Sequence, residues 1–295
     1  MQDNVIRAID KEGNIRVFVA NTTALVNDAR NIHDMTPTAS AALGRTLTAA
    51  IIMGAMLKNE KETVSIQLKG GGPIGTVLAV ANSKGQVKGY VGDPTVELPL
   101  KSNGKLDVSG AVGQNGKVTV IRDYGLKEPY IGQSDIVTGE IAEDMANYYA
   151  YSEQQPSAVA LGVLVDKDTS IKAAGGYMIQ VLPDASEEAI DRLEGNIANT
   201  EPISSLIEKG LTPEDILYHV CRGFDMAIKD KISVELTCDC SVERIQKALI
   251  AIGRIELEDI IENDGEAELI CHFCNKKYHF DREELRSLID KSDTQ

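Results

Sequence analysis

The sequence has little positive charge to set against its acidic residues. Its 30 Lys and Arg face 45 Asp and Glu, and the formal net charge is −15. Nucleic-acid binding needs basic side chains that displace counterions from phosphates, so we expect no nucleic-acid partner. The chain also lacks an apolar run of the roughly 18 residues that a membrane span needs, and a basic-then-apolar start. We therefore expect a cytoplasmic protein with no membrane partner.

The signs of catalysis are also missing. The four histidines have no nucleophile partner recognisable in the sequence, and no paired carboxylates stand out from the acidic background. One glycine-rich stretch, Gly70 to Gly75, invites comparison with a phosphate-binding loop. It lacks the Gly-Lys-Ser ending and leads into a strand-like segment, so a tight structural turn is favoured over a nucleotide site. We expect no enzyme; one that uses this loop is the least favoured alternative.

The chain of 295 residues is long enough for two domains, and its patterns predict an α+β fold. Residues 1–184 should form an α+β core domain of mixed antiparallel sheet and helix. It would begin with a hairpin that turns at residues 12–14. A helix from Thr36-Pro37 to Leu57 is apolar around most of its circumference, which indicates either a deep core or an interface. Short strands then follow, and residues 134–152 are expected to be helical.

Residues 185–230 are expected to form a helical connector. Apolar residues recur there at helical spacing, and Pro202 and Thr212-Pro213 supply helix starts. The expected amphipathic faces carry Ile190, Leu193, Ile197, Leu206 and Ile207. Cys221 lies on the apolar side of one of these helices, which is typical of a buried cysteine that acts as a small hydrophobe.

Residues 231–295 form the expected C-terminal α/β module, and they contain four of the five cysteines as Cys238-x-Cys240 and Cys271-x-x-Cys274. In a reducing compartment, such pairs favour a metal site over permanent disulfides, and tetrahedral zinc is the default. His272 and His279 are less favoured ligands because four thiolates are available. The module has few large apolar residues, so it needs a metal to stabilise its fold.

Electron-rich thiolates are the groups that oxidants attack first, so the same site has a possible redox role. Cys271 and Cys274 can close into a disulfide without difficulty, whereas a Cys238–Cys240 bond makes a small ring that is easily reduced. Spacing alone nevertheless favours a static zinc ribbon over a switch. The sequence thus leaves both open, a constitutive zinc-stabilised interaction protein and a redox-controlled one.

The two cysteine motifs, CDC and CHFC, closely resemble the zinc module of the bacterial 33 kDa heat shock protein family, which are redox-regulated chaperones. Six further segments resemble that family in the same order: PTASAALGRTLTAA, LKGGGPIG, GKLDVSGAVG, SEQQPSAVALGVLV, AAGGYMIQVLP and EPISSLIEKGLTPEDIL. The resemblance therefore covers nearly the whole chain.

The resemblance implies a specific cycle. One Zn²⁺ per chain would be held by Cys238, Cys240, Cys271 and Cys274 in a reduced, inactive form. Oxidation would form the disulfides Cys238–Cys240 and Cys271–Cys274 and release the zinc. The oxidised chain would form a homodimer and hold unfolded or oxidatively damaged client proteins without ATP, which protects them from aggregation under oxidative stress.

Overall fold

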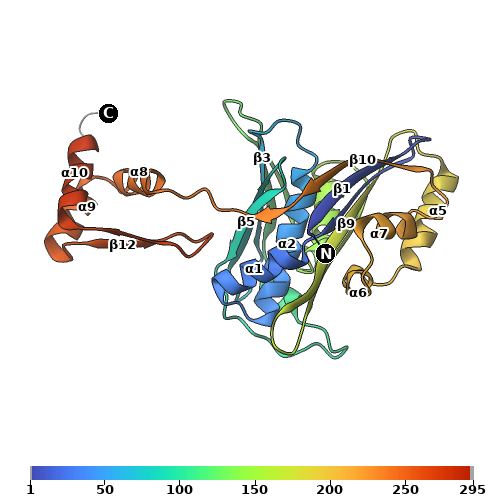
Figure 1. The fold of residues 1–295 in the computed structure, drawn as a ribbon, viewed down its shortest axis with the longest axis horizontal. Coiled ribbons are helices and arrows are strands. Elements are labelled where there is room, and N and C mark those ends of the chain that lie inside the picture. The colour runs from blue at the N-terminus through green and yellow to red at the C-terminus, as the bar shows by residue number, and fades with distance from the viewer. Residues whose placement is uncertain (1, 293–295) are drawn as a thin grey trace. The chain divides into compact units, whose positions relative to one another are not determined.

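The computed structural model describes residues 2–292, with side chains described up to residue 289. The chain divides into two compact units, Met1–Thr237 and Cys238–Gln295. Figure 1 shows the elements of both units, and the mixture of sheets and helices confirms the α+β class predicted from the sequence. Among the described residues, no helix combines the length and apolar character that a membrane span requires.

Two sheets form the framework of the first unit. The first is antiparallel throughout, with strands in the order β10 (Met226–Ser233), β1 (Asn4–Asp10), β2 (Ile15–Asn21), β9 (Ile171–Val181) and β8 (Ser157–Val165). The second has the order β11 (Glu235–Leu236), β5 (Gln86–Val91), β4 (Thr76–Asn82), β3 (Thr63–Lys69), β6 (Lys117–Asp123) and β7 (Tyr130–Asp135). The pairing of β11 with β5 is parallel, and the other pairs are antiparallel.

The predicted apolar helix, α2 (Pro37–Gly54), forms the core between these sheets. The Thr36 hydroxyl accepts a hydrogen bond from the amide of Ala39, which caps the helix start as expected. Every residue of α2 except Pro37 and Arg45 is buried. The helix contacts β3, β4 and β5 of one sheet and β2, β8 and β9 of the other. Of the two possibilities left open by the sequence, the structure therefore shows a deep core.

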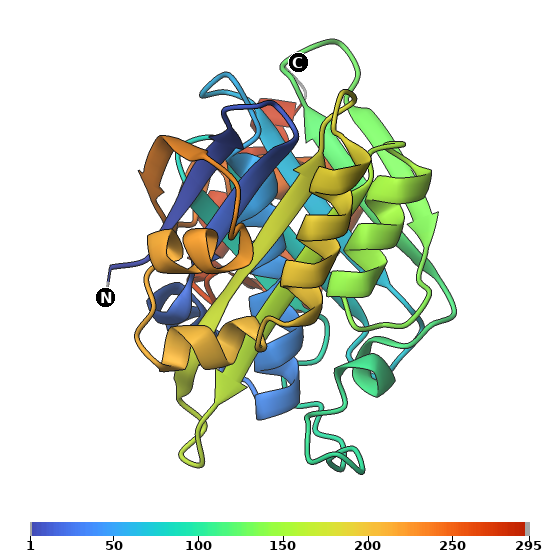
Figure 2. The same cartoon turned by 90° about the vertical axis from the view of Figure 1, so that its right-hand side faces the viewer.

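Six shorter helices complete the first unit: α1 (Thr23–His33), α3 (Val108–Val112), α4 (Ala142–Tyr151), α5 (Glu187–Ala198), α6 (Ile203–Glu208) and α7 (Pro213–Val220). Figure 2 shows α5, α6 and α7 over one face of the first sheet. Their predicted apolar residues Leu193, Leu206 and Ile207 are buried in a core cluster with side chains of β1, β2 and β9. The amphipathic pattern of this segment is thus confirmed.

Residues 134–152 were predicted to be one helical segment, and this prediction is wrong for the first half. Strand β7 continues to Asp135, and α4 begins only at Ala142. The buried carboxylate of Asp144 explains the delay because it accepts hydrogen bonds from the backbone amides of Val137, Thr138 and Ile141 at 2.8, 2.9 and 3.2 Å. These bonds hold residues 137–141 as a loop that a continuous helix could not form.

The glycine-rich stretch is a structural turn, as the sequence analysis favoured. The amides of Gly72 and Ile74 donate to the carbonyls of Val112 and Ala111 at 3.0 and 3.1 Å. A Cβ atom on Gly70 or Gly72 would lie only 2.3 Å from a backbone oxygen of that segment. The glycines therefore permit close backbone packing, and these two amides are used within the protein rather than for a phosphate.

The second unit contains α8 (Val242–Ile252), α9 (Arg254–Asn263), the hairpin β12 (Ala267–Ile270) and β13 (Lys277–Phe280), and α10 (Arg282–Ser292). Side chains cap two of these helices. Ser241 accepts from the amide of Arg244, and Asp281 and Glu284 form a reciprocal capping box at the start of α10. Nine buried residues form its core: Leu249, Leu257, Ile261, Cys271, Tyr278, Phe280, Leu285, Leu288 and Ile289.

Candidate metal centre

Two separate segments of the second unit supply the four cysteines. Cys238 and Cys240 lie in the extended segment before α8, whose start is fixed by the Ser241 cap. Cys271 and Cys274 lie in the turn between β12 and β13. This turn is closed by hydrogen bonds from the amides of Cys274 and Asn275 to the carbonyl of Cys271, at 3.3 and 2.8 Å. Asn275 takes a left-handed conformation with φ of 56°, which redirects the chain into β13.

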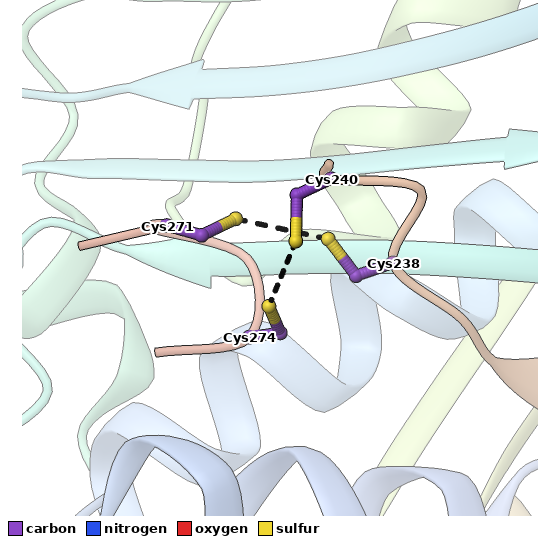
Figure 3. Close-up of side chains that lie close together, drawn as sticks. All are labelled: Cys238, Cys240, Cys271 and Cys274. Carbon is purple, nitrogen blue, oxygen red and sulfur yellow. Dashed lines mark hydrogen bonds between the residues drawn. The ribbon is translucent and has the colours of Figure 1, made fainter. Parts of the chain in front are cut away.

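The four sulfur atoms converge on one point, as Figure 3 shows. The Sγ atoms of Cys238 and Cys271 are 3.7 Å apart, and those of Cys240 and Cys274 are 3.4 Å apart. All four lie within 4.8 Å of one another. In a tetrahedral zinc site with Zn–S bonds of roughly 2.3 Å, the sulfurs are about 3.8 Å apart. The observed set therefore fits a metal ion bound by four thiolates.

The histidines that were considered as substitutes do not belong to this group. His272 and His279 are both exposed, and the metal-capable cluster among the described residues consists of the four cysteines. The Nε2 atom of His279 instead lies 3.6 Å from a carboxylate oxygen of Glu266. Cys221 is in the first unit, 2% exposed, and its pKa is raised to about 12 by burial and by the nearby Asp10 carboxylate. It is a protected thiol, as predicted.

One residue of the site was not found from the sequence. The hydroxyl of Tyr278 donates to the Sγ atom of Cys240 at 3.0 Å, and the Tyr278 side chain is buried. The alternation of β13 could have indicated its position, because Tyr278 and Phe280 share the face that points to the core. A hydrogen bond of this kind orients a sulfur ligand and stabilises its thiolate form.

The thiols of Cys238 and Cys240 differ in acidity in the folded unit when no metal is bound. Partial burial raises the pKa of Cys240, but hydrogen bonds from Tyr278 and from the neighbouring thiols outweigh burial and lower it to about 7. For Cys238, burial and the hydrogen bonds with the other thiols raise the pKa above its ordinary value. Because the thiolate is the form that reacts with oxidants, Cys240 is the thiol of this pair that is primed to react near neutral pH.

Comparisons with known proteins agree over nearly the full length of the chain. The family model described as Hsp33 protein matches residues 3–281. The 33 kDa chaperonin of Alkaliphilus metalliredigens is 52% identical over 99% of this chain and 100% of its own length. The 33 kDa chaperonin of Alkaliphilus oremlandii is 55% identical over 98% of this chain and 96% of its own length. The crystal structure of a 33 kDa chaperonin from Thermotoga maritima superposes with a TM-score of 0.92 at 36% identity, over 100% of both chains.

Proposed function

The chain belongs to the Hsp33 family, a family of chaperones rather than enzymes, and we propose that it is an ATP-independent holdase controlled by oxidation. In the reduced form it would be inactive and would bind one Zn²⁺ per chain. In the oxidised form it would bind unfolded or oxidatively damaged proteins in the cytoplasm and keep them from aggregating. The observation that carries this proposal is the convergence of four thiol sulfurs in a unit with a small core.

The proposed zinc ligands are Cys238, Cys240, Cys271 and Cys274. The sulfur spacing supports them, and thiolates are the ligands that structural zinc sites commonly use. When bound, zinc would join the two cysteine segments and offset the mutual repulsion of four thiolates. Structural zinc contributes roughly 10–16 kcal/mol in small domains, which is as much as the whole stability of a typical domain. A unit with nine buried core residues would then depend on its metal to stay folded.

Oxidation would break this dependence in two balanced steps. In each, a thiolate attacks the O–O bond of a peroxide and becomes a sulfenic acid, and a second thiol displaces water from it to form a disulfide. Each disulfide consumes one hydrogen peroxide and yields one water and one hydroxide, which takes a proton from solvent to become a second water. We propose the pairs Cys238–Cys240 and Cys271–Cys274, the pairs that the family resemblance implies. After both form, no thiolate is left to hold the metal, and the unit loses its main source of stability.

Client binding requires apolar surface that the folded protein buries. The connector proposed from the sequence, residues 185–230, is the first source, since Leu193, Leu206 and Ile207 pack against the first sheet. Local unfolding of α5, α6 and α7 would expose these side chains. In this proposal residues 1–184 form the core domain and residues 231–295 the redox-switch module. The oxidised form would be a homodimer, which enlarges the apolar surface offered to one client.

The deciding experiment compares one protein preparation in two states. The reduced, zinc-loaded chain and the peroxide-treated chain are each mixed with a thermally unfolding client, and light scattering and zinc release are followed together. Suppression of aggregation only after zinc release supports the switch. Equal activity in both states would instead favour the constitutive zinc-stabilised interaction protein.

A further inference from the structure

The short strand β11 is the last part of the first unit before the cysteines. It adds to the edge of the second sheet beside β5, in a parallel register that pairs Glu235 with Gln86 and Leu236 with Val87. The amides of Glu235 and Thr237 donate to the carbonyls of Gly85 and Val87 at 3.0 and 2.9 Å. Thr237 is bonded directly to Cys238, so the segment that closes this sheet edge is continuous with the proposed metal centre.

The side chains of this segment alternate in the manner of an edge strand with one buried face. Val234 is 8% exposed and belongs to the main core cluster, and Leu236 packs against the same cluster. Glu235, between them, is exposed, and its carboxylate accepts a hydrogen bond from the side-chain amide of Gln86 at 2.9 Å. β11 also contacts α1. We call the surface that Val234–Thr237 cover, including the carbonyls of Gly85 and Val87, the β5 edge.

β11 is held on the second sheet by a short backbone pairing. β11 pairs with the first two of the six residues of β5, whereas β10 pairs with all seven residues of β1. Parallel pairing is also slightly less stable per residue than the antiparallel pairing of the rest of this sheet. Because Cys238 follows Thr237 directly, a folded cysteine unit limits the conformations open to the end of β11 when the strand detaches. Unfolding of that unit removes this limit and favours release of the strand.

An uncovered β5 edge would favour another extended chain. Its main-chain carbonyls need donors, and the core beneath Val234 and Leu236 needs apolar cover. Strand addition supplies both, since main-chain hydrogen bonds provide affinity and alternate side chains fill the apolar positions. These requirements are met by most unfolded polypeptides, because they ask for two apolar residues two positions apart and for no particular sequence.

We propose that the β5 edge is a docking site for extended apolar segments of client proteins and that β11 covers it while the cysteine unit is folded. The proposal rests on the proposed function and adds to it a place and a mode of binding. Because β11 now covers this edge, β11 indicates the kind of chain that would bind there: an extended strand with alternate apolar side chains. A client strand would replace β11, donate to Gly85 and Val87, and place apolar side chains where Val234 and Leu236 lie.

A peptide with the sequence of residues 231–237, KISVELT, labelled with fluorescein, tests this site by fluorescence anisotropy with the full chain. We expect saturable binding to the oxidised chain that is at least about tenfold tighter than binding to the reduced, zinc-loaded chain. Methylation of the amide nitrogens that correspond to Glu235 and Thr237 should weaken binding by about tenfold or more, because it removes both donors. Methylation at the Leu236 nitrogen is the matched control, since that amide points away from β5 in a strand.

Equal binding of the differently methylated peptides, or equal binding to the reduced and oxidised chains, would overturn the proposal. A variant gives a second measurement. Leu236→Ser should loosen β11 and raise peptide binding to the reduced chain by about threefold or more without loss of zinc. Ile228→Ser, at a 38% exposed position on β10, should leave peptide binding unchanged.

The same oxidised sample is assayed for client protection, which separates this inference from the proposed function. Protection without peptide binding would refute the β5 edge alone. Peptide binding without client protection would refute the holdase function, but it would still support release of β11 from the β5 edge on oxidation. Competition between the peptide and an unfolded client for the oxidised chain would support both.

Discussion

Substitution of Leu285 by alanine should weaken zinc binding although Leu285 is not a ligand. Leu285 lies in α10, is fully buried, and packs in the same core cluster as Cys271 and Tyr278. Replacing a buried leucine by alanine costs about 2–5 kcal/mol. If the metal-free unit is unfolded, zinc binding and folding are one equilibrium, so this cost appears in the apparent affinity for zinc. A cost of about 3 kcal/mol corresponds to roughly a hundredfold loss.

The assay is competition for zinc between the reduced chain and a chromophoric chelator of known affinity. Ile255→Ala is the matched control, because Ile255 lies in α9 of the same unit and is 78% exposed. The control should change the zinc affinity by less than about threefold. The leucine variant should also release zinc and gain client protection at a lower dose of peroxide. An affinity of Leu285→Ala within threefold of the unaltered chain would refute the coupling between this core and the metal.

Three further outcomes are expected. Tyr278→Phe removes a donor to the proposed ligand Cys240, so the apparent zinc affinity of the reduced chain should fall by about tenfold or more in the same chelator competition. Folding lowers the pKa of Cys240 to about 7, so the Cys240 thiolate favours the folded form of this unit above the ordinary thiol pKa, and this contribution is lost as pH falls through about 7. Arg122→Met breaks a largely buried ion pair with Glu153 at 2.5 Å and should lower the free energy of unfolding by about 1–3 kcal/mol. Lys84→Met, which breaks an exposed ion pair with Glu60, is the control and should lower it by less than about 0.5 kcal/mol. Both are measured by urea denaturation. Cys221→Ser should change neither the zinc content nor the dose of peroxide that releases zinc. A shift in that dose would contradict the inference that the Cys221 thiol is protected by burial.

Local sequence patterns predicted the elements whose determinants lie close together in the chain. The first hairpin turns at Gly13, whose φ of 81° suits a glycine, and a helix begins at the predicted Thr212-Pro213 start, where Thr212 and Asp215 form reciprocal capping bonds. The capping box at the start of α10 is also formed by residues close together in the chain. Each depends on residues within a few positions, so the pattern alone contains the physical cause.

The elements that the sequence reading missed depend on distant partners. Strand β10 has an exposed, charged face over most of its length and becomes a strand because it pairs with β1, more than 200 residues away. Strand β11 has two residues, too few for a sequence pattern to predict a strand, and its backbone pairs with β5. Helix α1 was also missed. Its start is held by the carboxylate of Asp3, which accepts from the amide of Leu25 at 2.7 Å.

By itself, the sequence determined the chemistry of this protein. Two tight cysteine pairs predict a group of thiols that could hold a metal ion, because ligand type is a property of the side chains and their local spacing. Only the tertiary structure decided that the pairs meet. They lie on separate segments, and the packing of α8, α9 and α10 with the hairpin brings their sulfurs to 3.4 and 3.7 Å. It also decided that the residues before Cys238 close a sheet edge, since strand pairing depends on a partner elsewhere in the chain.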